Sequence, residues 1–421
     1  MKGALSVWWD GIQAGELRLN EHGEMSFAYL SEWVADPARP AISISLPKRI
    51  EVFGRRECRP FFAGLLPEEA QRDEVAHALG LSRGNDFALL KALGGDVAGA
   101  LTLWPAGEAP LKYDGATATE PLGDNALVEL LDILPKRPFL AGREGLRLSL
   151  AGAQTKLPVV LVDGRIALPA PGQPTTHILK PPIPRFSATT ENEAFAMRLA
   201  AAIGLSVAPV EPRKIADRPY LLVTRYDRSI DAKGVAHRLH QEDFCQALGI
   251  PPEHKYAVEG GPTFKTGFAL LRSATSRPAL EVLKLLDAAI FNLIVGNADA
   301  HGKNYSLLHT SNGITLAPLY DLLCTTAYPE LSPKLAMKIG GVATIEQVNA
   351  KMWKKFAEDT EIGMALVRRR AGELAEAMRT KAQVVAAEIS AAGFDGAALD
   401  RFASIAVERA DRIAVMTQKE V

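Results

Sequence analysis

Several features that would identify a protein class are scarce or missing in this sequence. Cysteine occurs only three times, as Cys58, Cys245 and Cys324, and these residues form no CxxC pair and have no paired histidine nearby. This spacing argues against a disulfide framework and against a cysteine-ligated metal site. We therefore expect free thiols in a reducing compartment.

Long hydrophobic runs are missing as well. The amino-terminal stretch MKGALSVWWDGIQAGELRL has one lysine but no continuous apolar segment. Nowhere in the chain does an uncharged apolar run reach the length of a membrane span. Neither a signal peptide nor a membrane anchor is predicted, and a cytoplasmic protein without membrane association is expected.

A surplus of charge of one sign is also missing, because 48 Lys and Arg residues face 49 Asp and Glu residues, for a formal net charge of −1. Such a chain has no overall electrostatic attraction to nucleic acid or to anionic membranes. If DNA is involved in its function, a partner is expected to supply most phosphate contacts. The content of 48% hydrophobic and 23% charged residues indicates an ordinary globular protein, and 421 residues suffice for two domains.

The first third of the chain reads as short strands followed by helices. Turn residues separate four expected strands in the first 50 residues, at 4–9, 16–19, 25–29 and 42–46. Helical periodicity follows over residues 67–92. The stretch 105–123, rich in Gly, Pro, Ala and Thr, is the best candidate for a linker, and a subdomain boundary is expected between it and about residue 140.

The rest of the chain begins with strands and becomes mainly helical beyond residue 239. Strands are expected at 146–150, 156–162, 165–168 and 175–180. Helices are expected at 191–203, which Gly204 ends, and at 280–295, where apolar residues recur every three or four positions until Gly296. A β-rich half followed by a helical half predicts an α+β protein with two lobes around a cleft.

A polar segment follows the helix at 280–295 and reads GNADAHGKNYS. Within it Asn304 comes five positions after Asp299, and Asp321 follows 22 positions after Asp299 in LAPLYDLLCT. Residues 305–309 and 313–317 read as a β-hairpin between them. Protein kinases use a D-x-x-x-x-N loop and a second Asp to orient the acceptor hydroxyl and to bind Mg²⁺. The spacing therefore predicts a site for phosphoryl transfer.

Taken one at a time, the Asp and Asn residues of this segment are more typical of turns and helix caps than of metal ligands. Their combination with Asp321, which lies between Leu319-Tyr320 and Leu322-Leu323, favours the functional interpretation. His301 has no nearby His or Cys with which to form a metal site. Lys303 is compatible with phosphate binding and equally with a solvated surface.

A kinase also needs a loop that contacts the nucleotide phosphates, and a lysine. The loop at 149–156 joins two expected strands, and its small residues would let backbone N–H groups approach phosphates. It matches neither G-x-G-x-x-G nor G-x-x-x-x-G-K-[ST]. Lys180 ends an expected strand, where a kinase lysine would pair with phosphates, and Glu191 and Glu193 are candidate partners for it.

At these residues the sequence resembles the HipA family, the serine/threonine kinase toxins of bacterial type II toxin–antitoxin systems. The resemblance extends over nearly the whole chain. It rests on the segments FFAGLLPEEAQRDEVAHALG, LLKALGGDVAGALTL, SLAGAQTK, THILK, ENEAFAMRLA, TRYDR, RLHQEDFCQALG, NADAHGKNYSLL and LAPLYDLL.

The resemblance implies an α+β, two-lobed protein-kinase-like fold. It divides the chain into an N-terminal subdomain (1–139), the β-rich core of the kinase N-lobe (140–228) and an all-helical C-lobe (229–421). Asp299 would be the catalytic carboxylate, and Asn304 and Asp321 would be the Mg²⁺ ligands.

The resemblance also implies which residues contact ATP. Lys180, His301 and Lys303 would lie near the phosphates. The phosphate loop would consist of Ala151, Gly152, Ala153, Gln154, Thr155 and Lys156, and the hinge at the adenine would consist of Thr224, Arg225 and Tyr226. Many family members have Glu-Arg-Phe-Asp-Arg at the hinge, whereas this chain has TRYDR, so side-chain contacts with the nucleotide are expected to differ.

Ser149 falls on the regulatory autophosphorylation site of the family. A phosphate there adds about −1.5 to −2 charge beside a loop that receives nucleotide phosphates, so repulsion should expel the loop and stop the reaction. Without the resemblance, a strand-end serine bonded to backbone would be the expectation.

The resemblance implies ATP and Mg²⁺ as cofactors and two kinds of protein partner. One is a HipB-like helix-turn-helix antitoxin, which would inhibit the kinase and supply the contacts to operator DNA. The other is the substrate, expected to be an aminoacyl-tRNA synthetase whose phosphorylation arrests growth. Two other functions stay open, because the polar cluster specifies ATP chemistry but not the acceptor. They are a small-molecule or lipid kinase and a catalytically silent corepressor.

Overall fold

The computed structural model describes residues 3–113, 119–143 and 145–418, and these form two compact units. Unit 1 comprises the described residues of Met1–Pro181 together with Arg213–Glu253 and Leu308–Thr310. Unit 2 comprises Pro182–Pro212, His254–Leu307 and the described residues of Ser311–Val421. Because the chain passes between the units several times, neither unit is a continuous stretch. The division of the sequence at residues 139 and 228 stays a prediction.

The strands of the described residues are short. They are β1 (Gly3–Trp9), β2 (Ile12–Leu19), β3 (Met25–Tyr29), β4 (Leu101–Pro105), β5 (Leu157–Val162), β6 (Arg165–Ala167), β7 (His177–Lys180), β8 (Val210–Ile215), β9 (Arg218–Thr224), β10 (Arg228–Ile230), β11 (Ala236–Arg238), β12 (Gln241–Asp243), β13 (Ser306–Thr310), β14 (Gly313–Leu316), β15 (Lys334–Ile339) and β16 (Val342–Thr344).

The α-helices lengthen toward the end of the chain. They are α1 (Ser31–Ala35), α2 (Arg55–Ala63), α3 (Glu69–Ala78), α4 (Asp86–Leu93), α5 (Asp124–Ile133), α6 (Thr189–Ala202), α7 (Phe244–Ala247), α8 (Phe264–Ala274), α9 (Pro278–Val295), α10 (Ala350–Thr360), α11 (Met364–Ala391) and α12 (Gly396–Gln418). Single 3-10 turns are η1 (Pro138–Leu140), η2 (Pro252–His254), η3 (Ala257–Glu259), η4 (Gly302–Asn304), η5 (Thr325–Ala327) and η6 (Ile345–Gln347).

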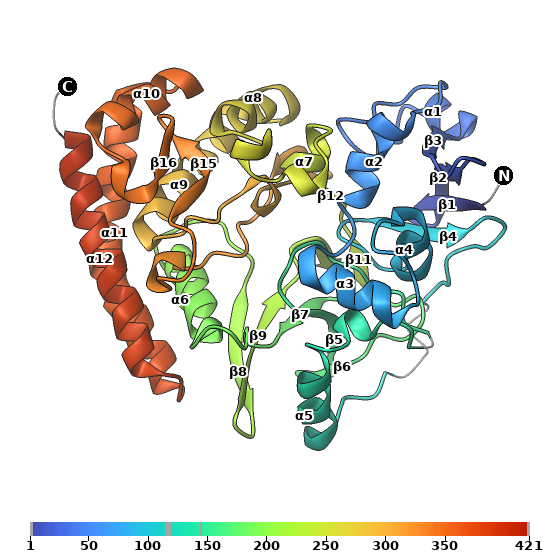
Figure 1. The fold of residues 1–421 in the computed structure, drawn as a ribbon, viewed down its shortest axis with the longest axis horizontal. Coiled ribbons are helices and arrows are strands. Elements are labelled where there is room, and N and C mark those ends of the chain that lie inside the picture. Colours follow the sequence, from blue (N-terminus) through green and yellow to red (C-terminus); the bar gives the residue numbers. More distant parts are fainter. Residues whose placement is uncertain (1–2, 114–118, 144, 419–421) are drawn as a thin grey trace. The chain divides into compact units, whose positions relative to one another are not determined.

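Two larger sheets have most of their strands in unit 1, beside the two-stranded antiparallel sheet of β10 and β11. The first has the order β3-β2-β1-β4 and joins the two ends of the amino-terminal region, because β4 pairs with β1 (Figure 1). The alternating burial of β3 shows that one face of this sheet is covered. The second sheet has the order β6-β5-β7-β9-β8 and carries Lys180 at the end of β7 and Thr224 at the end of β9.

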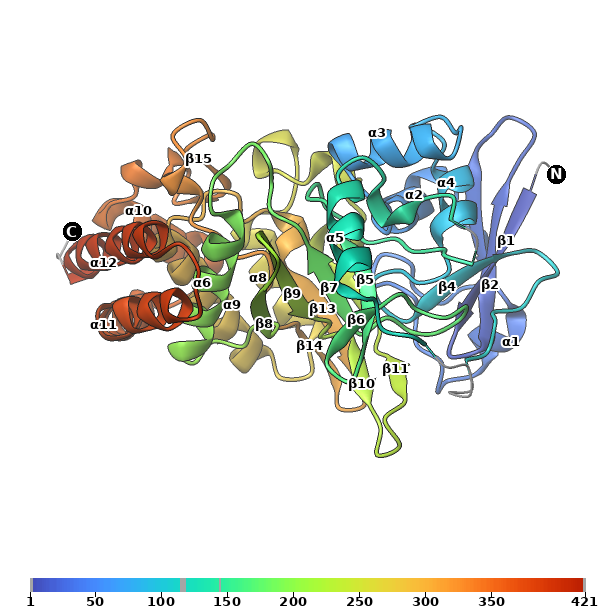
Figure 2. The ribbon, with the colours of Figure 1, turned by 90° about the horizontal axis from the view of Figure 1, so that it is seen from below.

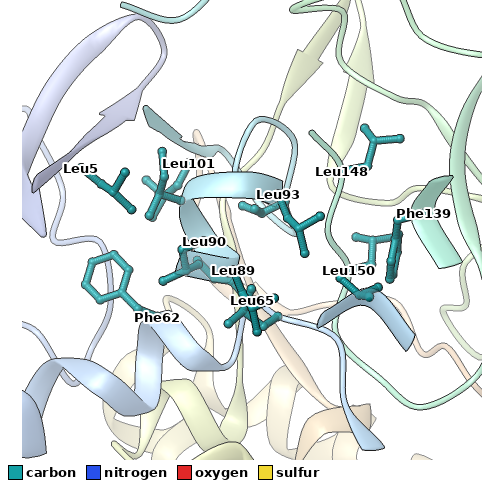
Figure 3. Packing of buried hydrophobic residues seen from close by; sticks show 14 of the residues in the cluster. Leu5, Phe62, Leu65, Leu89, Leu90, Leu93, Leu101, Phe139, Leu148 and Leu150 are labelled. Atoms are coloured by element: carbon teal, nitrogen blue, oxygen red, sulfur yellow. The ribbon is translucent and has the colours of Figure 1, made fainter. Parts of the chain in front are cut away.

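One hydrophobic core connects these two sheets within unit 1. Figure 3 shows Leu5 of β1, Leu101 of β4 and Leu90 of α4 near one another, with Leu148 and Leu150 in the same cluster. The cluster extends from Leu5 to Leu222 in the sequence, so it crosses the predicted boundary near residue 140. Burying one such side chain stabilises the fold by about 1.5–3 kcal/mol.

Unit 2 is mainly helical, and its longest helices lie side by side. Figures 1 and 2 both show α11 and α12 next to each other along their length. Helix α9 is buried over its last eleven residues. The Arg370 guanidinium of α11 donates to both carboxylate oxygens of Asp287 of α9, at 2.8 and 2.9 Å, which fixes one helix against the other. In the part of the chain that the structure describes, no helix is both long and apolar enough to span a bilayer.

Most of the expected strands and helices are present within a few residues of the predicted bounds, and the α+β class is confirmed. The all-helical character expected for residues 229–421 is wrong, because strands β11 to β16 lie in that range. The strand expected at 42–46 is wrong. Only an isolated bridge between Ser43 and Leu46 forms there, because the Ser43 hydroxyl (2.5 Å) and the Ile44 N–H (3.1 Å) donate to the Glu242 carboxylate.

The strand expected at 146–150 is wrong as well. Leu148 forms a single bridge with Asp96, in which the Asp96 N–H donates to the Arg147 carbonyl and the Ser149 N–H donates to the Asp96 carbonyl. The linker expected at 105–123 has no helix or strand between Pro105 and Gly123 in its described part, and residues 114–118 lie outside the described residues. All three cysteines are free, as expected, and the structure shows that all three are also buried.

Candidate active site

The polar segment begins where α9 ends at a glycine. Gly296 has a φ of +81°, which favours glycine, and an added Cβ would overlap the Thr326 hydroxyl. The Thr325 hydroxyl donates to the Gly296 carbonyl (3.1 Å) and accepts from the Ala298 N–H (2.8 Å). The segment after Asp321 is therefore bonded directly to the loop before Asp299.

Asp299 is the one exposed residue in the fully described stretch from 285 to 303, whose other residues are buried. Its N–H donates to Oδ1 of Asn297 (3.1 Å). Its carboxylate Oδ1 accepts a hydrogen bond from the Tyr256 hydroxyl (3.0 Å). A carboxylate fixed by its neighbours and open to solvent is suited to orient an incoming hydroxyl group.

A chain of buried amides supports this loop from inside unit 2. The Asn297 side chain donates to Oδ1 of Asn292 (2.9 Å), and the Asn292 side chain donates to the Tyr305 hydroxyl (2.9 Å). Burial raises the pKa of Tyr305 well above its ordinary value, so the hydroxyl stays protonated. Since each of these groups is buried, an unsatisfied member would be costly, and the network favours one loop conformation.

Tyr320, the neighbour of Asp321 in the chain, connects its segment to the segment that carries Asn304. The Tyr320 hydroxyl donates to the carbonyl of Lys303 (2.7 Å) and shares a hydrogen bond with the Ser306 hydroxyl (2.7 Å), so it contacts both residues that flank the pair Asn304-Tyr305. Asn304 Oδ1 accepts the N–H of His301 (3.1 Å). Asp321 has a φ of +53°, an uncommon conformation for a non-glycine residue that is found more often at functional sites.

The oxygen groups of Asn304 and Asp321 fit Mg²⁺ in chemistry. Magnesium usually takes one or two protein carboxylates, with phosphate oxygens and water completing the octahedron. Among the described residues there is no group of three or more His, Cys, Asp or Glu side chains placed to hold a metal.

The predicted phosphate loop lies in unit 1 and is bonded to the start of α3. The N–H of Gly152 donates to the Glu68 carboxylate (3.2 Å), and the Glu68 N–H donates to the Gly152 carbonyl (3.2 Å). The Gln71 side chain donates to the Gln154 carbonyl, and the Lys156 ammonium donates to the Ala151 carbonyl. In this conformation the Gly152 N–H is bonded to a carboxylate of the protein itself.

Ser149 precedes this loop and is fully buried, with 0% exposure. Its hydroxyl donates to the Leu65 carbonyl (2.8 Å). Phosphorylation of Ser149 is impossible in this conformation, because a buried hydroxyl bonded to backbone cannot reach a phosphate donor. The loop has to leave the core before Ser149 can react.

In the predicted hinge, residues 224–226, the backbone and the side chain of Arg225 form hydrogen bonds within the protein. The Arg225 N–H donates to the Thr176 carbonyl (3.0 Å). The Arg225 guanidinium is 1% exposed and donates to Asp227 (2.7 and 2.9 Å) and to Asp96 (3.3 Å). The Arg225 side chain is therefore directed into the protein, and the Tyr226 hydroxyl donates to the Gln241 side chain.

Arg225 belongs to a buried ionic cluster that joins the hinge to the Gly95-Asp96 turn of the amino-terminal region. Asp96 also accepts from the Thr175 hydroxyl (2.6 Å), Arg228 (3.0 Å) and Arg238 (2.9 Å). Burial would raise the pKa of Asp96, but the three guanidinium groups outweigh it and bring that pKa well below its usual range. Arg225 and Arg228 likewise outweigh burial at Asp227 and lower its pKa to about 2.

The remaining predicted residues are mostly buried. His301 and Lys303 have exposures of 8% and 6%, so Lys303 is not a solvated surface lysine. Lys180 is 5% exposed in unit 1, and Glu191 and Glu193 are buried on α6 in unit 2. The structure therefore places the acidic residues Asp299 and Asp321 in unit 2, and the phosphate loop, Lys180 and the hinge in unit 1.

Sequence profiles of one family match most of this chain. The HipA-like C-terminal domain matches residues 148–386, and the HipA N-terminal domain matches residues 5–104. The chain belongs to the HipA family. The resemblance found in the sequence is thereby confirmed, and with it the kinase-like α+β fold class.

Two similar proteins carry the word kinase in their names. The protein Y4mE of Sinorhizobium fredii is 58% identical over 408 residues, which are 96% of this chain and 97% of that protein. The serine/threonine-protein kinase toxin HipA of Shewanella oneidensis is 33% identical over 291 residues, which are 66% of each chain. Among solved structures, HipA from the HipA, HipB and operator DNA complex of Shewanella oneidensis MR-1 superposes with a TM-score of 0.83. That match has 26% identity and covers 99% of this chain and 100% of that one.

Several residues of this HipA-family site were not recognised from sequence. Asn297 lies inside the polar segment, and its amide could have been read as a loop support because it sits two positions before Asp299. Glu68, Tyr256 and Asp96 lie far from their partners in the chain, and only the motifs PEEAQ, HKYAVEGGP and GGDVAG mark their positions. Nothing local in those motifs specifies the contacts.

Proposed function

We propose that this HipA-family chain is an ATP- and Mg²⁺-dependent serine/threonine protein kinase and acts as the toxin of a toxin–antitoxin pair. Asp299 supports this proposal most directly, because its carboxylate is exposed at the centre of an otherwise buried loop and its backbone and side chain are both hydrogen-bonded. The names of the relatives Y4mE and HipA support the kinase class.

In the proposed reaction, Asp299 accepts a hydrogen bond from the hydroxyl group of a serine or threonine of the substrate. The acceptor oxygen forms a bond to the γ-phosphorus, the bond from that phosphorus to the bridging oxygen of ADP breaks, and the hydroxyl proton passes to the carboxylate. Asn304 and Asp321 would hold Mg²⁺, which when bound neutralises phosphate charge.

The residues of unit 1 would bind the nucleotide. Lys180 and Lys156 supply positive charge for the phosphates, and the residues from Ala151 to Thr155 supply backbone N–H groups. The family resemblance also implies phosphate contacts for His301 and Lys303, and we propose these residues as further ATP ligands. Because the Arg225 side chain and N–H are engaged elsewhere, we propose that the hinge contributes to adenine binding through other backbone groups between Thr224 and Tyr226.

Ser149 is proposed as the site of inactivating autophosphorylation. A phosphate of about −1.5 to −2 charge cannot return to the buried position of the Ser149 hydroxyl, which lies against the Leu65 carbonyl, because neither charge nor volume is accommodated there. The loop from Ala151 to Lys156 would then be unable to return to its docked conformation, in which Gly152 is bonded to Glu68.

The experiment that tests this function uses purified protein with Mg²⁺ and γ-labelled ATP, followed by mass spectrometry of the peptide 146–156. Asp299→Ala is the matched control, since its side chain is exposed and its removal should not affect folding. Phosphate on Ser149 in the wild type and none in Asp299→Ala is expected. Absence of phosphoryl transfer from a wild type that binds ATP would overturn the kinase proposal.

The partners are proposed from the solved relative, whose structure contains HipB and operator DNA. We expect a HipB-like helix-turn-helix antitoxin to bind this chain and to supply most DNA contacts, consistent with the net charge of −1. Operator binding should therefore be lost when the antitoxin is omitted. The protein substrate is proposed to be an aminoacyl-tRNA synthetase, and phosphoproteomics after induction would contradict this if no synthetase site appeared.

A further inference from the structure

In unit 2 the Tyr256 hydroxyl donates to the Asp299 carboxylate, at 3.0 Å from Oδ1. The terminal torsion of an aspartate is broad and roughly two-fold, so an exposed carboxylate rotates unless another group fixes it. The hydrogen bonds of the loop described above act on the Asp299 backbone, whereas this bond acts on the reacting group itself.

The position of Tyr256 is set by backbone contacts on both sides. The carbonyl of Lys255 accepts the N–H of Gly302 (3.2 Å), which lies three residues after Asp299. The Tyr256 carbonyl accepts the N–H groups of Glu259 (3.0 Å) and Gly261 (2.9 Å), and this closes a turn around η3. The backbone that carries Tyr256 is therefore bonded directly to the catalytic loop.

Close packing keeps the same segment against the loop. A Cβ added at Gly302 would overlap the ring of Pro262, and one added at Gly261 would overlap the His254 carbonyl. The Tyr256 ring also meets the His301 ring edge to face, with centroids 5.4 Å apart. These contacts hold the segment that carries the phenol against the loop of Asp299.

We propose that Tyr256 is a positioning residue for phosphoryl transfer, which holds the Asp299 carboxylate in the rotation that meets the acceptor hydroxyl. This inference rests on the proposed kinase function. A phenol O–H that donates to a carboxylate favours its ionised form, which is the form that accepts the hydroxyl proton. Tyr256 does not touch the nucleotide in this role, so its effect should fall on the turnover step.

The test compares Tyr256→Phe with the wild type, since phenylalanine keeps the ring and its contact with His301. We expect kcat to fall roughly 10- to 100-fold, the range for a hydrogen bond to an ionised group, with an unchanged KM for ATP. We also expect the acid limb of the pH profile of kcat to move to higher pH, because the carboxylate loses a donor that favours ionisation. A residue with a purely structural role would not move that limb.

Tyr29→Phe is the matched control. Its buried hydroxyl in unit 1 donates to the Leu46 carbonyl (2.5 Å) and accepts the Ile42 N–H (2.9 Å), so the same substitution removes two hydrogen bonds without touching the loop of Asp299. Tyr29→Phe should lower the melting temperature and leave the pH profile unchanged.

Three results would overturn the inference. In an active wild type, a kcat of Tyr256→Phe within twofold of the wild type and an unmoved acid limb would remove the positioning role alone. A rise in kcat would show that the phenol blocks the acceptor position. A wild type that binds ATP but transfers no phosphoryl group would overturn the proposed function and this inference together.

Discussion

Replacing Asp96 with Asn should destabilise unit 1 strongly. The substitution keeps the size of the side chain but removes the charge that faces Arg225, Arg228 and Arg238. Removing one partner of a buried charge network typically costs about 3–5 kcal/mol, because the remaining charges stay buried. This is a large fraction of the roughly 5–15 kcal/mol that stabilises a typical domain.

The change should be visible in thermal unfolding at pH 7. For a folding unit of about 150–250 residues, each kcal/mol shifts the midpoint by roughly 2–4 °C, so a decrease of about 6–20 °C is expected for Asp96→Asn. Asp132→Asn is the matched control. Asp132 also makes two hydrogen bonds with one guanidinium, that of Arg218 (2.7 and 2.9 Å), but on the surface, where solvent screens the pair.

The control should leave the midpoint nearly unchanged. If Asp96→Asn shifted the midpoint no more than Asp132→Asn does, the buried cluster would not be a stabilising network of paired charges, and the reasoning would be refuted.

The pH dependence of the free energy of unfolding tests the same cluster independently. The pKa of Asp227 is about 2 in the folded state against about 3.9 in an unfolded chain, so its contribution is present above pH 4 and is lost as pH falls toward 2.

Two further predictions concern a buried histidine and the phosphate loop. Burial and the charge of His309 lower the pKa of His240 to about 3, so its stabilising contribution is present above the unfolded pKa of about 6.5 and is lost toward pH 3. In the wild type, the free energy of unfolding should therefore rise with pH by up to about 1.4 kcal/mol per pH unit between about pH 3 and 6.5. His240→Gln should remove this dependence. Glu68→Ala frees the Gly152 N–H and weakens the docked loop by a charge-assisted hydrogen bond, so Ser149 should be phosphorylated on the order of tenfold faster.

The predictions for His240 and for Glu68 can each be contradicted by one result. An equal slope of stability between pH 6.5 and 3 in the wild type and in His240→Gln would mean that another group titrates. For the loop, Glu74→Ala changes an exposed carboxylate of α3, the helix that follows Glu68, and should leave the rate of Ser149 phosphorylation unchanged. Equal rates in Glu68→Ala and Glu74→Ala would show that the carboxylate does not retain the loop.

The sequence alone predicted the order and type of the elements well where periodicity was strong. The helix that ends at Gly296, the hairpin between Asn304 and Asp321 and the family resemblance all follow from local pattern and spacing. The two strands that were expected at 42–46 and 146–150 but do not form fail for one reason. Their backbone groups bond to Glu242 and Asp96, which are distant in the chain, and propensity cannot register such partners.

What only the tertiary structure decided is how distant residues meet. Glu68 reaches Gly152 across 84 positions, and Asp96 reaches Arg225 across 129. Side chains in such contacts obey no local periodicity, since the packing of whole elements brings them together. Spacing along the chain therefore sufficed to identify Asp299 as a candidate carboxylate, whereas its contact with Tyr256 depends on the turn that tertiary packing places against the loop.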